Sequence, residues 1–288
     1  MKTGLVLEGG ALRGMFTVGI LDVFMREGIT FDGMIGVSAG AAFGCNFKSR
    51  QQGRALRYNT KYCNDWRYCS VRSLIKTGDL FGGDFCYHYL PAHLDHFDNE
   101  VFDNNPMKMW CVCMDVETGE AIYHLCDKAG DECFEWLRAS ASMPMVSKIV
   151  EIDGHKMLDG GMVDSIPLAK MEQLGHGRNV VILTQPEGFV KKPNKLMPLV
   201  KRVMRRYPRV VEAMACRHEG YNKALEYVRQ QQAAGNVFAI YPEEKLPIGH
   251  TSSDPGQLRR VYDLGVARAE QLLPSLRTWL AAGQTTEK

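Results

Sequence analysis

The chain has 288 residues, of which 45% are hydrophobic and 24% are charged, so it is long enough to bury a substantial core in one large domain or two small ones. Its 35 lysines and arginines nearly balance 33 aspartates and glutamates, and a net charge of +2 is too small to indicate nucleic acid as a partner. No segment approaches the ~20 uninterrupted apolar residues of a membrane-spanning helix.

The first segments predict strands that alternate with helices. Thr3–Leu7 is an apolar run followed by Gly9 and Gly10, which is typical of a buried strand, and Met15–Arg26 has apolar residues at helical spacing. The segment FDGMIGV leads into Ser38 as a second strand, and AGAAFGCNF follows as a helix. This order favours a parallel sheet with helices on its faces.

The later segments predict two hairpins, further helices and two more strands. MWCVCMDVETGEAIYHL and IVEIDGHKMLDGG read as hairpins, CFEWLRASAS as a helix and NVVILTQ as a buried strand. Residues 191–234 are mostly helical in pattern, NVFAIY (about 236–241) reads as a strand that returns to the core sheet, and Pro255–Ala282 as a last helix kinked at Pro274. We therefore expect an α/β core with a mostly parallel sheet over residues 1–188, and a mainly helical C-terminal segment over residues 189–288.

The segment EGGALRG lies where a strand gives way to a helix. Backbone N–H groups at such a place, together with the positive end of the helix, bind negative charge. A dinucleotide-binding loop fits poorly, because Ala11 stands at the third position of the G-x-G-x-x-G pattern and Asp32 stands at the start of the second strand instead of its end. The loop therefore predicts a site for a phosphate or for the oxyanion of an acyl-transfer intermediate.

The segment GVSAG places Ser38 between an apolar strand and a helix. This is the geometry of a nucleophile elbow, in which a strained turn lifts the serine oxygen into a cleft. The alternative is a serine that caps the following helix. A nucleophilic serine needs a base, and the eight histidines offer no evident partner, so the aspartate of DGG, Asp159, is the better candidate.

Taken together and in this order, EGGALRG, GVSAG, ASASMP and DGG resemble the patatin-like phospholipase family in its bacterial cytoplasmic branch, over about Thr3 to Thr184. The resemblance implies a Ser–Asp dyad without histidine, metal or cofactor: Ser38 would be the nucleophile and Asp159 the base. The N–H groups of Gly9 and Gly10 would form the oxyanion hole. The supporting positions of the motifs would be Arg13, Gly14, Gly36, Gly40 and Gly160.

Two positions depart from the family's pattern. Ala11 stands where relatives have a third glycine, and an alanine there must either change the loop or adopt an unfavourable positive φ. Asp164 stands where relatives often carry asparagine, and it offers a second carboxylate near the site. The choice of Asp159 as the base therefore competes with Asp164.

The sequence thus predicts a cytoplasmic serine acyl hydrolase that acts on a phospholipid or another acyl ester. The alternatives are an esterase, thioesterase or acyltransferase for small soluble acyl compounds, and a non-catalytic module that binds an anion or a lipid head group. The basic stretch Lys191–Arg209 is either a transient contact with an anionic membrane surface or a solvated helix whose apolar face packs on the core. The cluster His88, His93 and His96 is a weak alternative for a metal site.

Overall fold

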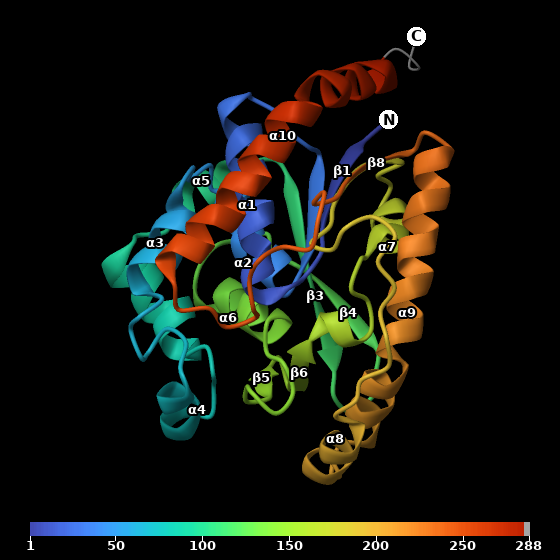
Figure 1. The fold of residues 1–288 in the computed structure, drawn as a ribbon. Coiled ribbons are helices and arrows are strands. Elements are labelled where there is room, and N and C mark those ends of the chain that lie inside the picture. The colour runs from blue at the N-terminus through green and yellow to red at the C-terminus, as the bar shows by residue number, and fades with distance from the viewer. Residues whose placement is uncertain (285–288) are drawn as a thin grey trace.

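A mixed sheet of eight strands forms the centre of the computed structural model, which describes residues 1–284 (Figure 1). The strands are β1 (Thr3–Leu7), β2 (Gly33–Val37), β3 (Lys108–Asp115), β4 (Ala121–Leu125), β5 (Val150–Ile152), β6 (His155–Asp159), β7 (Arg178–Ile182) and β8 (Val237–Ile240). They are ordered β5-β6-β3-β2-β1-β7-β8, and β4 pairs with β3. The predicted α/β class is confirmed.

The parallel part of the sheet consists of β3, β2, β1, β7 and β8. From β1 the chain builds outward through β2 and β3 on one side, and it later adds β7 and β8 on the other. The strand order therefore reverses at β1, and the crevice at the carboxyl ends of such strands is where α/β sheets bind ligands. The antiparallel strands β4, β5 and β6 join at the β3 side, as the two hairpin patterns predict.

Helices cover both faces of this sheet (Figure 1). They are α1 (Gly14–Arg26), α2 (Ala39–Lys48), α3 (Arg54–Tyr62), α4 (Val71–Thr77), α5 (Asn99–Asn104), α6 (Asp131–Ser140), α7 (Leu168–Gln173), α8 (Met197–Val203), α9 (Pro208–Ala233) and α10 (Pro255–Gln284), with the short turns η1 (Ala11–Arg13), η2 (Phe85–Leu94) and η3 (Gly160–Met162). Side chains of a strand alternate between faces. Leu5 and Leu7 accordingly share a buried cluster with α1, α2 and α10, while Val6 packs with α7 and α9.

The C-terminal segment is joined to this core at two places besides α9. β8 extends the sheet as the parallel partner of β7. On the other face, α10 lies directly against α1: a Cβ added to Gly19 would lie 2.2 Å from the carbonyl oxygen of Tyr262, and one added to Gly265 would lie 2.0 Å from that of Phe16. Any side chain at either glycine would force the two helices apart. α10 continues through Pro274 and bends in its C-terminal part (Figure 1).

Candidate active site

Ser38 occupies a strained turn between β2 and α2. Its backbone angles are φ 54° and ψ −124°, a combination that non-glycine residues rarely adopt and that costs about 1–3 kcal/mol. Only glycine fits at the two flanking positions of this turn, because the backbone passes too close for a side chain. A Cβ at Gly36 would lie 2.6 Å from the nitrogen of Ala41, and one at Gly40 would lie 2.4 Å from the oxygen of Leu7. The backbone therefore has the shape of a nucleophile elbow.

The register of the sheet brings Asp159 to this serine. β2 ends where Val37 pairs with Val112 of β3, and on β3 the next residue, Cys113, pairs with Asp159 of β6. β4 occupies the other edge of β3 over the same residues, so β2 and β6 meet end to end on one edge. The Ser38 hydroxyl lies close enough to the Asp159 carboxylate to lower the pKa of that carboxyl.

Asp159 is almost fully buried, with 1% of its surface exposed. Its Oδ1 accepts a hydrogen bond of 2.7 Å from the amide of Gly161, and its own amide donates to the carbonyl oxygen of Ser142 at 2.8 Å. Burial raises the pKa of the Asp159 carboxyl, while the Arg217 guanidinium, the Ser38 hydroxyl and the Gly161 amide act in the opposite direction. A carboxylate with a raised pKa beside a serine hydroxyl is suited to accept a proton near neutral pH.

Ser140 supports the elbow from behind, a role that the sequence did not reveal. Its Oγ accepts a hydrogen bond of 3.0 Å from the amide of Ser38 and donates one of 2.7 Å to the carbonyl oxygen of Val112. The segment ASASMP therefore holds both partners, because Ser140 contacts the serine and Ser142 contacts the aspartate. Only the resemblance had singled out this segment.

The glycine loop lies directly beside Ser38. A Cβ on Gly9 would come within 2.9 Å of the Cβ of Ser38, and one on Gly10 within 2.8 Å of Thr184 Oγ1. In the part of the chain that the structure describes, no hydrogen bond is formed by the amides of Gly9 and Gly10, so both remain available to a bound oxygen. Ala11 has φ 48°. The loop therefore keeps the backbone shape expected with a glycine there, and Ala11 adopts a left-handed conformation that is unfavourable for alanine.

Glu8 anchors this loop, a function that no motif of the sequence indicated. The side chain is 2% exposed and accepts hydrogen bonds from the amide of Thr184 at 2.5 Å and from the hydroxyl of Tyr221 at 2.7 Å. The carboxylate thus ties the end of β1 to the end of β7 and to α9.

The other predicted supporting residues lie around the same loop and turn. The Arg13 guanidinium lies next to Gly10 and its Nη1 is 2.9 Å from Nε2 of His250. A Cβ at Gly14 would lie 2.8 Å from the ring of Phe43. At Gly160 it would lie 2.3 Å from the carbonyl oxygen of Val112, which explains why the residue after Asp159 is a glycine.

Asp164 is not brought to the serine. Its Oδ2 accepts a hydrogen bond of 2.8 Å from the hydroxyl of Tyr123, and burial raises the pKa of its carboxyl. Of the histidine cluster, His88 contacts Glu135 at 2.6 Å, on α6. Residues 1–284 contain no group of three or more histidine, cysteine or acidic side chains placed to hold a metal ion.

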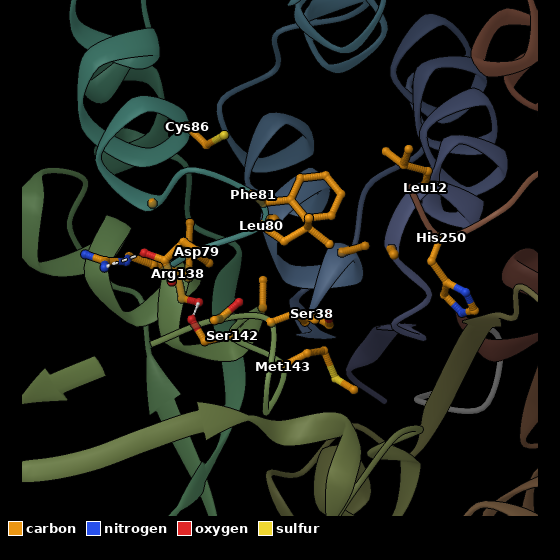
Figure 2. Close-up of a pocket in the computed structure, with 18 of the residues that line it drawn as sticks. Leu12, Ser38, Asp79, Leu80, Phe81, Cys86, Arg138, Ser142, Met143 and His250 are labelled. Atoms are coloured by element: carbon orange, nitrogen blue, oxygen red, sulfur yellow. Dashed lines mark hydrogen bonds and ion pairs between the residues drawn. The ribbon is translucent and has the colours of Figure 1, made fainter. Parts of the chain in front are cut away.

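A cavity of about 670 Å³ opens at Ser38, a size that suits an organic ligand. One part is lined by apolar side chains of the helices and the preceding loop, among them Phe43, Phe81, Leu90, Phe134 and Leu137. Basic side chains of the C-terminal segment also line the cavity, among them Lys191, Arg217 and His250. Figure 2 shows Phe81, Cys86 and the Asp79–Arg138 ion pair on one side of Ser38, and His250 on the other.

The family model described as patatin-like phospholipase matches residues 5–171, which is more than half of the chain. The chain belongs to the patatin-like phospholipase family. This membership confirms the resemblance seen in the motifs and supports a lipid hydrolase activity. A second model, described as a domain of unknown function (DUF6363), matches residues 207–281.

The relatives of this patatin-like chain differ widely in length. The uncharacterized protein YjjU of Escherichia coli (strain K12) is 28% identical over 287 residues, which covers 92% of this chain and 75% of YjjU. Lysophospholipase NTE1 of Coccidioides immitis (strain RS) is 25% identical over 181 residues, 60% of this chain and 11% of that protein. Among solved structures, VipD from Legionella pneumophila is 12% identical with a TM-score of 0.47, covering 95% of this chain and 67% of that one.

The basic stretch 191–209 forms a loop and α8, and α8 presents two different apolar faces. Val200 and Met204 are buried in a cluster with α9, as expected of a helix that packs on the core. Leu199 and Val203 are 49% and 53% exposed, and Leu196, which precedes the helix and lines the cavity, is 58% exposed. None of the described helices is long and apolar enough to cross a membrane.

Proposed function

We propose that this protein is a serine acyl hydrolase that cleaves lipid acyl esters through the Ser38–Asp159 dyad. The observation that carries the proposal is the placement of the strained Ser38 beside the buried Asp159, where Ser38 lines a largely apolar cavity. Family membership supports the lipid hydrolase class, and the dyad assigns the chemistry to two residues.

In the proposed reaction Asp159 accepts the proton of the Ser38 hydroxyl as the serine oxygen attacks the ester carbonyl. The developing oxyanion receives hydrogen bonds from the free amides of Gly9 and Gly10, each of which is worth about 10²–10³ in rate in comparable acyl-transfer sites. Asp159 then returns the proton to the leaving alcohol. A water molecule that is deprotonated by Asp159 releases the acid from the acyl-enzyme.

The proposed base function belongs to Asp159 alone. Asp164 is held by Tyr123 instead of Ser38, and no histidine of residues 1–284 forms a hydrogen bond with Ser38. The two histidines that line the cavity contact other groups: His250 contacts Arg13, and His218 contacts the carbonyl oxygen of Ala215.

The first experiment is hydrolysis of p-nitrophenyl esters of increasing acyl length by the natural protein and by Ser38→Ala, Asp159→Asn and Asp164→Asn. We expect Ser38→Ala and Asp159→Asn to lower kcat/KM at least 10³-fold, while their unfolding temperatures stay close to that of the natural protein. Asp164→Asn keeps most of the activity. Full activity of Asp159→Asn would contradict the dyad, and a preference for the shortest esters would favour an enzyme for small soluble acyl compounds.

We also propose that α8 and the loop before it contact an anionic lipid surface. Leu196, Leu199 and Val203 are exposed, and the exposed basic side chains Lys195, Lys201, Arg202, Arg205 and Arg206 surround them. Such a combination binds interfaces through apolar insertion and charge attraction. Because Leu196 also lines the cavity, a lipid leaving the surface would reach the serine directly.

This contact is tested by sedimentation with vesicles that contain 30% anionic lipid and with uncharged zwitterionic vesicles. We expect the natural protein to bind the anionic vesicles and the double variant Leu199→Gln, Val203→Gln to bind at least tenfold more weakly, because each change removes one inserted apolar side chain. Leu264→Gln on α10 is the matched control, since Leu264 is 42% exposed and α10 lies far from α8 (Figure 1). Equal binding by the double variant would contradict the proposal.

A further inference from the structure

Three cationic side chains from separate parts of the chain converge beside the glycine loop. The Arg13 guanidinium lies against Gly10, with its Nη1 2.9 Å from His250 Nε2. Arg217 donates from Nε to the carbonyl oxygen of Gly161 at 2.6 Å. The Lys191 ammonium lies 4.2 Å from the centre of the Tyr221 ring. Except for Arg13, these side chains all come from the segment after β7.

Carboxylates oppose these charges from a distance, since Asp159 faces Arg217 and Glu8 faces Lys191, but no close ion pair forms within residues 1–284. Among residues 1–284, none of Arg13, Lys191 and Arg217 forms a salt bridge, and Arg13 Nε is buried without a hydrogen-bond partner. Glu8 is close to Lys191, but it already accepts hydrogen bonds from two uncharged donors. Burial lowers the pKa of Lys191 to about 8, and the neighbouring Arg217 adds to this effect. Burial, and secondly Arg13, also lower the pKa of His250.

The backbone holds the lysine in this unfavourable position. The amide of Lys191 donates to Asn222 Oδ1 at 2.8 Å, and the carbonyl oxygen of Lys191 accepts from Asn222 Nδ2 at 3.0 Å. A loop clamped in this way to α9 keeps a cation in a crowded positive environment. A group of like charges that the fold maintains is suited to a multiply charged anion, which would relieve the repulsion.

We propose that Arg13, Lys191 and His250 bind a phosphate monoester carried on the alcohol part of the substrate. The proposal rests on the acyl hydrolase function of Ser38. With the acyl chain in the apolar part of the cavity and the carbonyl oxygen at Gly9 and Gly10, the alcohol part points toward the basic side chains. The preferred substrates are therefore acyl esters of a small phosphorylated alcohol such as glycerol phosphate, in preference to uncharged acyl glycerols.

The test compares an acyl glycerol phosphate with the acyl glycerol of the same medium chain, both below their critical micelle concentrations so that no lipid surface is present. We expect the natural protein to prefer the phosphate ester at least tenfold in kcat/KM, and Lys191→Met to reduce this preference about tenfold or more, the usual effect of a lost charge-assisted hydrogen bond. His250→Gln reduces it less. Lys223→Met is the matched control: Lys223 is exposed on α9 and absent from the cavity wall, so the preference stays unchanged.

The pH dependence of the preference gives a second measurement. A phosphate monoester gains its second negative charge near pH 6, and Lys191, with its pKa of about 8, loses its charge above that pH. The other charged groups facing Lys191 are Arg13, Arg217, Glu8 and His250. The preference should rise through pH 6 and fall above pH 8, and in Lys191→Met the fall above pH 8 should be absent.

The outcomes separate this proposal from the dyad. Equal hydrolysis of both esters by the natural protein, or an equal loss on both in Lys191→Met, overturns the phosphate site and leaves the dyad intact. If neither ester is hydrolysed, the hydrolase function is overturned, and calorimetry on Ser38→Ala decides the phosphate site. There we expect a non-hydrolysable ether analogue of the acyl glycerol phosphate to bind, and the uncharged ether to bind far more weakly. Inorganic phosphate that binds as tightly as the analogue would mean a site for free phosphate and would overturn the head-group assignment.

Discussion

Replacing Arg217 by methionine should change the pH at which the enzyme works. Arg217 Nη2 and Asp159 Oδ1 both lie within 3.3 Å of the point that a Cβ on Gly161 would occupy, so the two charges are about 6 Å apart or closer. At an effective dielectric constant of about 20, this separation corresponds to an attraction of about 3 kcal/mol between the ionised groups. The arginine therefore holds the base in its ionised form against the effect of burial.

The sign of the expected change follows from the function of the base. Asp159 must be ionised to accept the serine proton, so activity falls as the pH drops through its pKa. Arg217 lowers that pKa, and its removal raises it. The acid limb of kcat/KM should then move up by about one to two pH units, a displacement typical of an opposite charge at this range.

The assay is kcat/KM for an uncharged acyl ester from pH 4 to 9, with the released acid quantified by chromatography. An uncharged ester avoids any contribution from the proposed phosphate contacts. Arg217→Lys is the control, because it keeps the positive charge but loses the planar group that donates to Gly161. We expect its acid limb to stay near that of the natural protein. If Arg217→Met lowers activity equally at all pH values, Arg217 acts through packing on Gly161 and the electrostatic argument is wrong.

Three further changes test the site. Ser38→Gly should be about 1 kcal/mol more stable in chemical unfolding than Ser38→Ala, because glycine accepts the strained backbone angles at lower cost; equal stabilities would mean that the turn is unstrained. Ser140→Ala should lower kcat/KM about tenfold or more, since it leaves the Ser38 amide and a buried carbonyl unpaired, whereas Ser142→Ala keeps the backbone contact with Asp159 and should lose less. Leu90→Trp should shift the preference toward shorter acyl esters, because Leu90 is 2% exposed and lines the apolar part of the cavity; an unchanged chain-length profile would place the acyl chain elsewhere.

The local patterns of the sequence predicted most of the fold. Thr3–Leu7 forms β1 with the predicted bounds, and the hairpin predicted over IVEIDGHKMLDGG forms, with positive φ at Asp153 and Gly154 of its turn. These features depend on near neighbours in the chain, so periodicity and turn residues suffice to find them. The family motifs also pointed to Ser38 and Asp159, which the structure brings together, although their catalytic functions stay predictions.

The parts that the sequence did not reveal depend on contacts between distant residues. Arg217 approaches Asp159 from the middle of α9, where neither spacing nor composition distinguishes it from any other surface arginine. Glu8 is adjacent to the glycine loop in the sequence, but its hydrogen-bond partners Thr184 and Tyr221 are 176 and 213 residues away along the chain. For α8 the two readings of the sequence were not exclusive, since one apolar face packs on the core while another is exposed.

The shared edge of β3 has a consequence for how such a chain can change over evolution. Because β2 and β6 meet end to end on that edge, the number of residues in β3 determines the distance between Ser38 and Asp159. The long segment between α2 and β3 contributes the wall of the cavity and can gain or lose residues without moving either group. A single residue inserted between Val112 and Cys113 would shift Asp159 by one position and turn its side chain to the opposite face of the sheet. We therefore expect related enzymes that differ in substrate to differ in the sequence and length of that segment. The length of β3 should stay constant among them.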